Sequence, residues 1–212
     1  MSYLIDFILH IDEHLITIVN MFGDWTYLIL FAIIFVETGV VIMPFLPGDS
    51  LLFAAAAMAA NPKYHLDIWI FVACFFIASM LGDSSNYAIG HKVGHSLTKN
   101  SFLSRFIRKD DLVKTELFFE KHGGKAIIIA RFMPIIRTLV PFVAASSGFP
   151  YKTFLHYNLL GNALWVIICC SGGYFFGNFT IVKEHFSLII LGIIVVSLIP
   201  AVVGALKARL SK

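Results

Sequence analysis

Charged residues are scarce in this sequence. Asp, Glu, Lys and Arg make up 14% of its 212 residues, hydrophobic residues make up 58%, and no Lys or Arg precedes Lys63. Soluble domains contain about 25% charged residues, so the composition excludes a water-soluble globular protein. A cleaved signal peptide would begin with cations, and we therefore expect the amino-terminal segment to be retained.

Cysteine is equally rare. Cys74, Cys169 and Cys170 all lie in apolar segments and form no Cys-x-x-Cys pair. This pattern excludes a disulfide framework and a zinc site, and we expect neither a metal nor another cofactor. The three thiols are interpreted as small apolar packing groups.

Long apolar blocks dominate the rest of the chain. They cover residues 27–60, 66–91, 125–149, 154–177 and 186–206, each close to or above the ~20 residues that cross a bilayer as a helix. A membrane barrel would instead show alternating segments of about 10 residues. We predict an all-α integral membrane protein with a single membrane domain, 1–212. Residues 1–26 are predicted to form an amphipathic helix at the interface, or a first span packed against protein.

The cations predict the orientation. Eight of the sixteen Lys and Arg residues lie between Lys92 and Lys125, so the loop 92–124 should be cytoplasmic. Lys207, Arg209 and Lys212 place the carboxyl terminus on the same side. An even number of crossings must separate the two, and the spans 154–177 and 186–206 supply it. The block 125–149 must then enter and leave on one face, as a re-entrant hairpin.

The basic loop also contains acids, which offset part of its positive charge. We therefore expect no nucleic-acid partner, and we predict a surface helix over residues 110–121.

Proline and charge interrupt both hairpin blocks. Non-helical backbone at hydrocarbon depth survives only where protein or water satisfies it, and each buried charge costs about 2.5–3.5 kcal/mol. The block 27–60 has the same build as 125–149 and should dip from the opposite face, which gives two oppositely oriented units as in inverted-repeat transporters. The residues predicted to break the hairpins are Pro44, Pro47, Gly48, Pro134 and Pro141.

The two hairpins differ in the sign of their charge. The first contains the acids Glu37 and Asp49, and the second contains Arg131 and Arg137. The opposite charges should face one another. One interpretation is a set of buried ion pairs that only hold the hairpins together. The other is a transport site, in which the acids exchange protons while the arginines bind a phosphate through bidentate hydrogen bonds.

Three ordered motifs resemble those of the bacterial DedA family, part of a superfamily that includes eukaryotic lipid scramblases and is named for the VTT domain. The motifs are Glu37-Thr38-Gly39 to Pro44-Phe45-Leu46-Pro47-Gly48-Asp49, Gly82-Asp83 to Asn86-Tyr87, and Arg131-Phe132-Met133-Pro134 through Arg137-Thr138 to Pro141.

The resemblance implies a multi-spanning protein of the bacterial inner membrane that returns the carrier lipid undecaprenyl phosphate across the membrane, coupled to the proton motive force. It implies that Arg131 and Arg137 bind the phosphate and that Glu37 and Asp49 carry protons or form ion pairs. Asp83, Asn86 and Tyr87 are expected to support the site or to anchor nearby backbone.

Other functions stay open at this stage. They are a general lipid scramblase, a proton-coupled transporter of small solutes, a lipid phosphatase within the membrane, and a structural or insertion factor. A phosphatase needs an activated nucleophile, and no His lies near Arg131 or Arg137 in the sequence. We therefore expect that the protein is not an enzyme.

Overall fold

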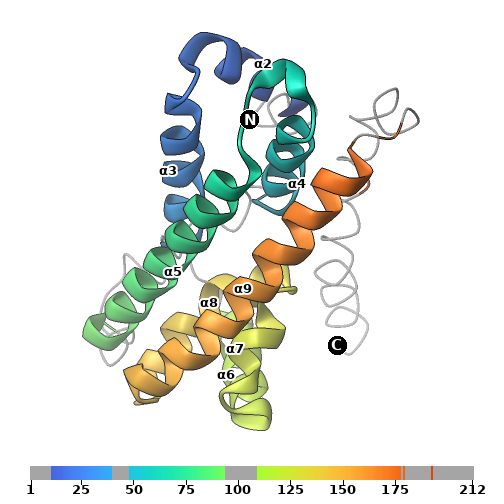
Figure 1. Ribbon diagram of the computed structural model, residues 1–212. Coiled ribbons are helices and arrows are strands. Elements are labelled where there is room, and N and C mark those ends of the chain that lie inside the picture. The colour runs from blue at the N-terminus through green and yellow to red at the C-terminus, as the bar shows by residue number, and fades with distance from the viewer. Residues whose placement is uncertain (1–10, 40–47, 94–108, 178, 180–191, 193–212) are drawn as a thin grey trace.

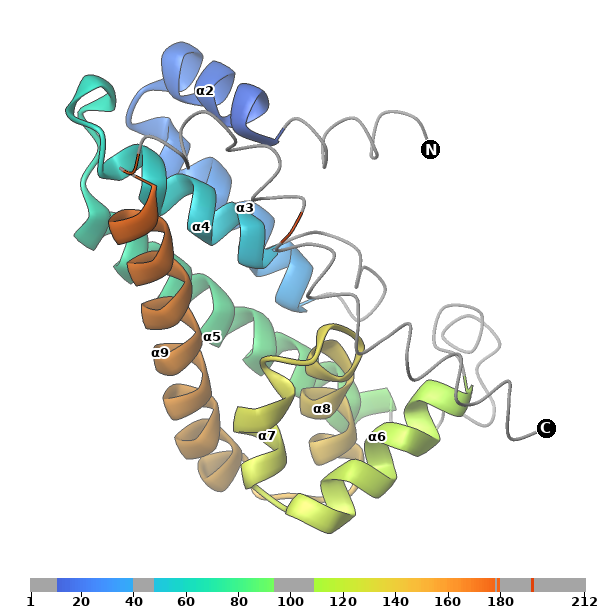
Figure 2. The same cartoon turned by 90° about the vertical axis from the view of Figure 1, so that its right-hand side faces the viewer.

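The computed structural model describes residues 11–39, 48–93, 109–177, 179 and 192. These residues are almost entirely helical and contain no strand. Figures 1 and 2 show two long helices flanked by shorter ones. In chain order the elements are α2 (Ile11–Phe22), α3 (Trp25–Gly39), α4 (Gly48–Ala59), the 3-10 helix η1 (Pro62–Tyr64), α5 (Ile68–Val93), α6 (Lys109–His122), α7 (Lys125–Ala130), α8 (Pro134–Ser146) and α9 (Tyr151–Phe176).

The helices α5 and α9 are the structural axis of the molecule. Each has 26 residues, a length of about 39 Å at 1.5 Å per residue, which exceeds the ~30 Å of hydrocarbon in a bilayer. They are the two helices in the described part of the chain that are long and apolar enough to cross a membrane. They coincide with the predicted spans 66–91 and 154–177, whereas the predicted span 186–206 lies outside the described residues.

The buried residues occupy equivalent positions in α5 and α9, because each buried residue of α5 has a counterpart in α9 that lies 83 positions later in the sequence. Both also have Phe at the first buried position and Gly at the last, although the two sequences otherwise have little in common. The buried residues of α5 are Phe71, Phe75, Ala78, Ser79, Gly82, Asp83, Asn86, Tyr87 and Gly90; their counterparts in α9 are Phe154, Asn158, Gly161, Asn162, Trp165, Val166, Cys169, Cys170 and Gly173, of which Cys169 alone is half-buried.

The pair α3 and α4 covers one half of this axis. α3 runs beside the first half of α5, from a ring contact between Tyr27 and Phe71 at 4.6 Å to the approach of Gly39 to Gly82. α4 runs beside the second half of α9, where Gly173 lies against the backbone of Phe53. Because α5 and α9 are antiparallel, the outer ends of α3 and α4 lie at the same end of the molecule.

The pair α7 and α8 covers the other half in the same way. α7 runs beside the first half of α9, with Ile128 against Gly161. α8 runs beside the second half of α5, with Phe142 against Gly90. The outer ends of α7 and α8 therefore lie at the opposite end of the molecule, and the inner ends of all four helices meet halfway along α5 and α9.

Two apolar clusters fill the two halves. One is built around α3, α4, the start of α5 and the end of α9, and it also takes Leu15 and Val19 from α2. The other is built around α6, α7, α8, the end of α5 and the start of α9. The level between them, where the short helices meet, contains the buried charges.

The sequence predictions need two corrections in this region. Pro141 does not break the second hairpin, because α8 runs through it from Pro134 to Ser146. Proline has no backbone N–H, so one hydrogen bond of the helix is lost at Pro141. The loss is tolerated because the neighbouring residues pack tightly, with Phe142 and Ala144 fully buried. The predicted helix over 1–26 is also too long, since α2 ends at Phe22 and α3 begins at Trp25.

The remaining predicted breaks lie at helix boundaries or beyond the described residues. Gly48 is the first residue of α4 and Pro134 the first of α8. Pro44 and Pro47 lie outside the described residues. Within the basic segment, α6 covers the predicted surface helix 110–121.

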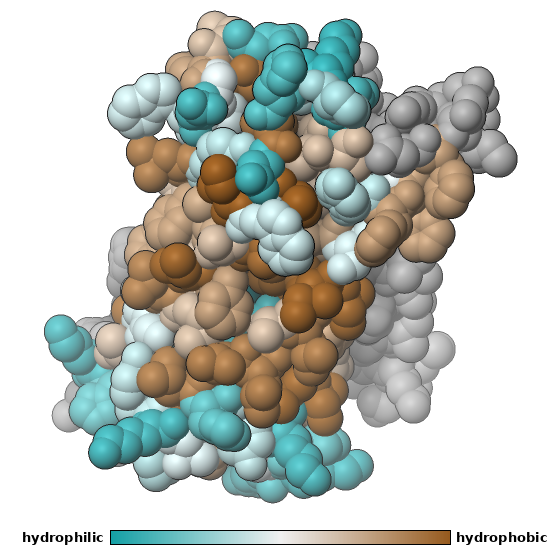
Figure 3. Space-filling view, viewed as in Figure 1, coloured by the Kyte–Doolittle hydropathy of each residue, from teal (hydrophilic) through white to brown (hydrophobic). Residues whose placement is uncertain are grey.

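The molecular surface has an apolar belt. Figure 3 shows brown, hydrophobic side chains across the middle of the molecule and teal, hydrophilic ones at its two ends. α9 contributes much of this belt, because a full stripe of its large apolar side chains is exposed: Leu159, Leu160, Leu164, Ile167, Ile168 and Phe175. Water disfavours a surface of this kind, whereas lipid accepts it.

We predict that Gly173→Ala lowers the midpoint of thermal unfolding. A Cβ at position 173 would overlap the backbone of Phe53, and overpacking of this kind costs about 1–3 kcal/mol. Gly172→Ala is the matched control, because its Cβ would lie 3.7 Å from the Phe53 ring, an ordinary contact. The test is thermal unfolding of both purified variants in detergent; equal midpoints would contradict the close packing of α4 on α9.

Candidate functional site

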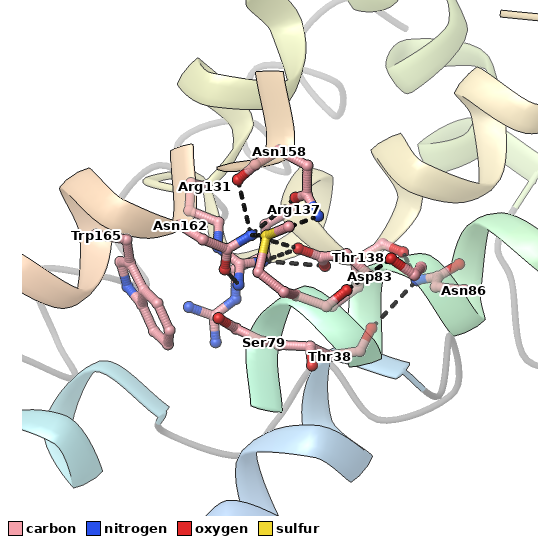
Figure 4. Close-up of polar contacts among 12 residues, drawn as sticks. Thr38, Ser79, Asp83, Asn86, Arg131, Arg137, Thr138, Asn158, Asn162 and Trp165 are labelled. Atoms are coloured by element: carbon pink, nitrogen blue, oxygen red, sulfur yellow. Dashed lines mark hydrogen bonds and ion pairs between the residues drawn. The ribbon is translucent and has the colours of Figure 1, made fainter. Parts of the chain in front are cut away.

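Charged side chains converge where the short helices meet. Glu37 lies in the last turn of α3, Asp49 in the first turn of α4, Arg131 just after α7, and Arg137 in the first turn of α8. The middle of α5 adds Asp83, and the middle of α9 adds Asn162 and Trp165. Figure 4 shows Asp83, Arg131 and Asn162 turned toward one another, with Trp165 beside them. The breaks in the helices thus place these groups at one level.

Arg137 joins α8 to α3 and α4. Its guanidinium donates to Asp49 Oδ1 from Nη1 at 2.9 Å and to Glu37 Oε1 from Nη2. Glu37 Oε1 also accepts from the backbone N–H of Gly48 at 3.3 Å. A Cβ at position 48 would overlap the Glu37 carboxylate, so glycine at the start of α4 lets the acid approach. The predicted pairing of first-hairpin acids with a second-hairpin arginine is present here.

Arg131 has a different acidic partner. Its Nη1 lies 3.0 Å from the carboxylate of Asp83, and its Nη2 donates to Asn162 Oδ1. The amide of Asn162 in turn donates to Asp83 Oδ2 at 3.0 Å and to Asn158 Oδ1 at 2.8 Å. Arg131, Asp83 and Asn162 therefore form a closed ring of hydrogen bonds between α5, α9 and the end of α7.

Trp165 links the two arginines. Its ring centroid lies 4.8 Å from Cζ of Arg131 and 5.7 Å from Cζ of Arg137. Its indole N–H donates to Asp49 Oδ1 at 2.7 Å. The aromatic face stabilises both cations while the ring edge holds one acid, so Trp165 contacts the ion pairs of both arginines.

Asn86 connects α3 and α8 at a second point. Its side-chain amide donates to the backbone carbonyl of Thr38 at 3.3 Å and to that of Thr138 at 2.7 Å. Tyr87, predicted together with it, lies apart from the charges and donates its hydroxyl to the carbonyl of Phe149 at 2.5 Å. Of the three residues predicted to support the site, Asp83 and Asn86 therefore lie at the level of the charge cluster, whereas Tyr87 lies in the far half of α5.

The cluster is buried but has one accessible acid. The exposed fraction is 1% for Glu37 and Asp83, 5% for Arg131 and 8% for Arg137, whereas the Asp49 side chain is 24% exposed. Glu37 Oε2 and Arg131 Nε are buried without a hydrogen-bond partner among the described residues. With every group ionised, three acids outnumber two arginines, and Asp49 is the most exposed of the five charged groups.

Sequence reasoning missed the contribution of α9. Asn158 and Asn162 are one turn apart in an apolar helix, a pattern that is first read as helix packing. The same pattern also marks a polar stripe at membrane depth, which indicates a functional interior. Trp165 gave no signal, because a tryptophan in an apolar span is unremarkable in the sequence.

The comparisons with known proteins place the chain in a family. Residues 46–175 match the VTT domain. The chain is 48% identical over 207 residues to Protein DedA of Escherichia coli, which covers 98% of this chain and 94% of that protein.

More distant relatives are also membrane proteins by name. The chain is 39% identical over 188 residues to an uncharacterized membrane protein of Mycobacterium tuberculosis (89% of this chain, 82% of that protein). It is 33% identical over 180 residues to the inner membrane protein YghB of Escherichia coli (85% and 78%). No solved structure matches the chain significantly. The chain thus belongs to the DedA family of membrane proteins, whose matched unit is the VTT domain.

Proposed function

We propose that this protein moves a lipid with a phosphate headgroup, polyprenyl phosphate, across the bacterial inner membrane, coupled to the proton motive force. The observation that carries the proposal is Arg137, a buried guanidinium held by two carboxylates at the meeting point of four short helices. Carboxylate and phosphate oxygens make the same bidentate contact to guanidinium, so the two compete for it.

We also propose that α3–α4 and α7–α8 are re-entrant hairpins that enter from opposite faces of the membrane. α3, α4 and α8 have 15, 12 and 13 residues, fewer than the ~20 needed to cross. Their outer ends lie at opposite ends of α5 and α9, and these two helices bury equivalent positions. This arrangement supports an inverted repeat with its site halfway across.

Proton coupling follows from the surplus of acid. An entering phosphate would meet three carboxylates and two arginines, and a net negative site repels an anion. Protonation of Asp49 or Glu37 removes a competing negative charge and frees donors of Arg137 for the phosphate. Loss of the proton restores the ion pair and expels the anion. Asp49 is the first acceptor because it is the most exposed of the three acids.

The identity of the lipid rests on kinship and on the surface. The family resemblance points to undecaprenyl phosphate, and YghB is named an inner membrane protein. The apolar belt at the level of the charges suits a substrate that keeps its chain in lipid while its headgroup enters the protein (Figure 3). The alternatives are a scramblase without lipid preference, a small-solute transporter and a lipid phosphatase.

We predict that Arg137→Gln abolishes transport and that Asp49→Asn leaves transport independent of an imposed pH gradient. The first variant removes the phosphate ligand, and the second removes the exposed proton acceptor. The assay is the change in accessibility of labelled polyprenyl phosphate in vesicles containing purified protein. Lys63→Gln, an exposed cation in η1, is the control.

Three results would separate the alternatives. Gradient-dependent transport that survives in Glu37→Gln, Asp49→Asn would exclude proton coupling through these acids. Equal movement of phosphatidylcholine would indicate a general scramblase. Release of inorganic phosphate would indicate a phosphatase.

We predict that the ring of hydrogen bonds formed by Arg131, Asp83 and Asn162 contributes to stability as well as to transport. Asp83→Asn leaves a buried cation without its acid, and loss of one partner of a buried pair costs about 3–5 kcal/mol. Asp83→Asn, Arg131→Gln should lose less stability than the two single variants combined. Thermal unfolding in detergent measures this coupling.

The same double variant separates the structural interpretation from the functional one. If Arg131 also binds phosphate, transport stays lost although the double variant loses less stability than the two single variants combined. Transport by the double variant would show that the pair only holds the fold.

A further inference from the structure

A second polar region lies outside the charge cluster, at the end of the molecule where α5 ends and α9 begins (Figure 1). A cavity of about 580 Å³ opens there, a volume typical of small-ligand sites. It is lined mainly by Ser84, Tyr87, His91, Lys92, Phe149 and Tyr151. The proposed transport cycle uses none of these side chains.

The cavity has a polar rim and an aromatic wall. His91 and Lys92 are exposed in the last turn of α5. α9 begins at Tyr151, and no side chain of the described residues caps its first turn, so its N–H groups and helix dipole favour an anion at the same place. Tyr87 and Tyr151 pack ring against ring at 5.2 Å. The rim is thus suited to an anion and the wall to an apolar chain.

The cavity follows α5 toward the charge cluster. Ser84, Tyr87, Ala88 and His91 have the spacing of one helical face, and Ser84 directly follows Asp83 in the sequence. The distance along the helix from Ser84 to His91 is about 10 Å. At the inner end, the hydroxyl of Tyr151 donates to Ser84 Oγ at 3.1 Å, and Ser84 Oγ in turn donates to the carbonyl of Met80.

We propose that this cavity is a second lipid site, which binds the phosphate monoester headgroup of a membrane lipid outside the ion-pair cluster. His91 and Lys92 bind the phosphate together with the first turn of α9, and Tyr87, Phe149 and Tyr151 contact the first apolar units of the chain. Passage of the headgroup between this cavity and the ion pairs rests on the proposed function, whereas binding at this cavity does not.

The test is photolabelling of the full-length protein in vesicles with a polyprenyl monophosphate that carries a diazirine on its first isoprene unit. Mass spectrometry should find the label on peptides containing Tyr87 and Tyr151. His91→Gln, Lys92→Gln should reduce this label about tenfold, since two charge-assisted contacts are lost. Both side chains are exposed, so the variant should unfold at the wild-type temperature.

The matched control is Lys152→Gln, which removes an exposed cation from the same turn of α9 that is not part of the cavity lining. Its labelling should equal that of wild type. An equal loss in this control would overturn the proposal in favour of general surface charge. Undiminished labelling in the double variant would also overturn it.

Competitors identify the ligand chemistry. Unlabelled polyprenyl monophosphate should displace the probe, whereas polyprenol and inorganic phosphate should not. Displacement by polyprenol would reduce the cavity to an apolar groove, and displacement by inorganic phosphate would make it a site for free anions; either result overturns the proposal.

The two proposals fail separately. Label that depends on His91 and Lys92 in a protein that moves no lipid would sustain the second site and contradict the proposed function. The opposite result is transport that depends on Arg137 but keeps its kcat and KM in His91→Gln, Lys92→Gln. It would sustain the proposed function and contradict the second site.

Discussion

The desolvation of Arg137 and Arg131 is the constraint on which the rest of this structure depends. A guanidinium stays charged in any protein environment, so burial at membrane depth is possible only when carboxylates and other acceptors surround it. Those acceptors come from α3, α4, α5 and α9, elements far apart in the sequence. Continuous helices would carry such groups past one another at different depths. The helix breaks at Gly48 and around Arg131 bring them to one level, and the arginines in turn hold the four helix ends together.

The ion pairs of Arg131 and Arg137 are connected through shared contacts. Trp165 touches both cations and also holds Asp49, while Asn86 holds a carbonyl from each hairpin. Trp165 therefore lies between the partly exposed Asp49 and the Arg131–Asp83 pair. Under the proposed function, these contacts would connect protonation of Asp49 to a rearrangement of the short helices, provided that the cluster has two alternative sets of partners. The carboxylates and a phosphate headgroup would be those alternatives.

The long helices α5 and α9 bury equivalent positions, but the residues that they contribute to the site differ. α5 packs against α3 and α8, whereas α9 packs against α7 and α4. At the central level, however, the equivalent of Gly82 is Trp165 and that of Asp83 is Val166. One helix thus contributes the acid and the other contributes the indole and the amide. A symmetric site would place like charges together at the centre, which a low-dielectric interior strongly disfavours.

Much of this protein could be read from its sequence, because the physics concerned is local. Apolar length identified the spans at 66–91 and 154–177, and proline beside charge at membrane depth identified Glu37, Asp49, Arg131 and Arg137 as one interior group. Side-chain pairing is not local, so the choice of Asp83 for Arg131, the place of Trp165 between the arginines and the roles of Asn86 and Asn162 came only from the tertiary structure. Pro141 shows the same limit, since a residue that breaks an isolated helix is accepted where tight packing on α5 stabilises the turn around it. The sequence by itself determined which groups must leave water, because that cost depends on each residue and its neighbours in the chain. Only the tertiary structure decided which partners meet them, because those partners lie up to 116 positions apart and are brought together by the packing of short helices on two long ones.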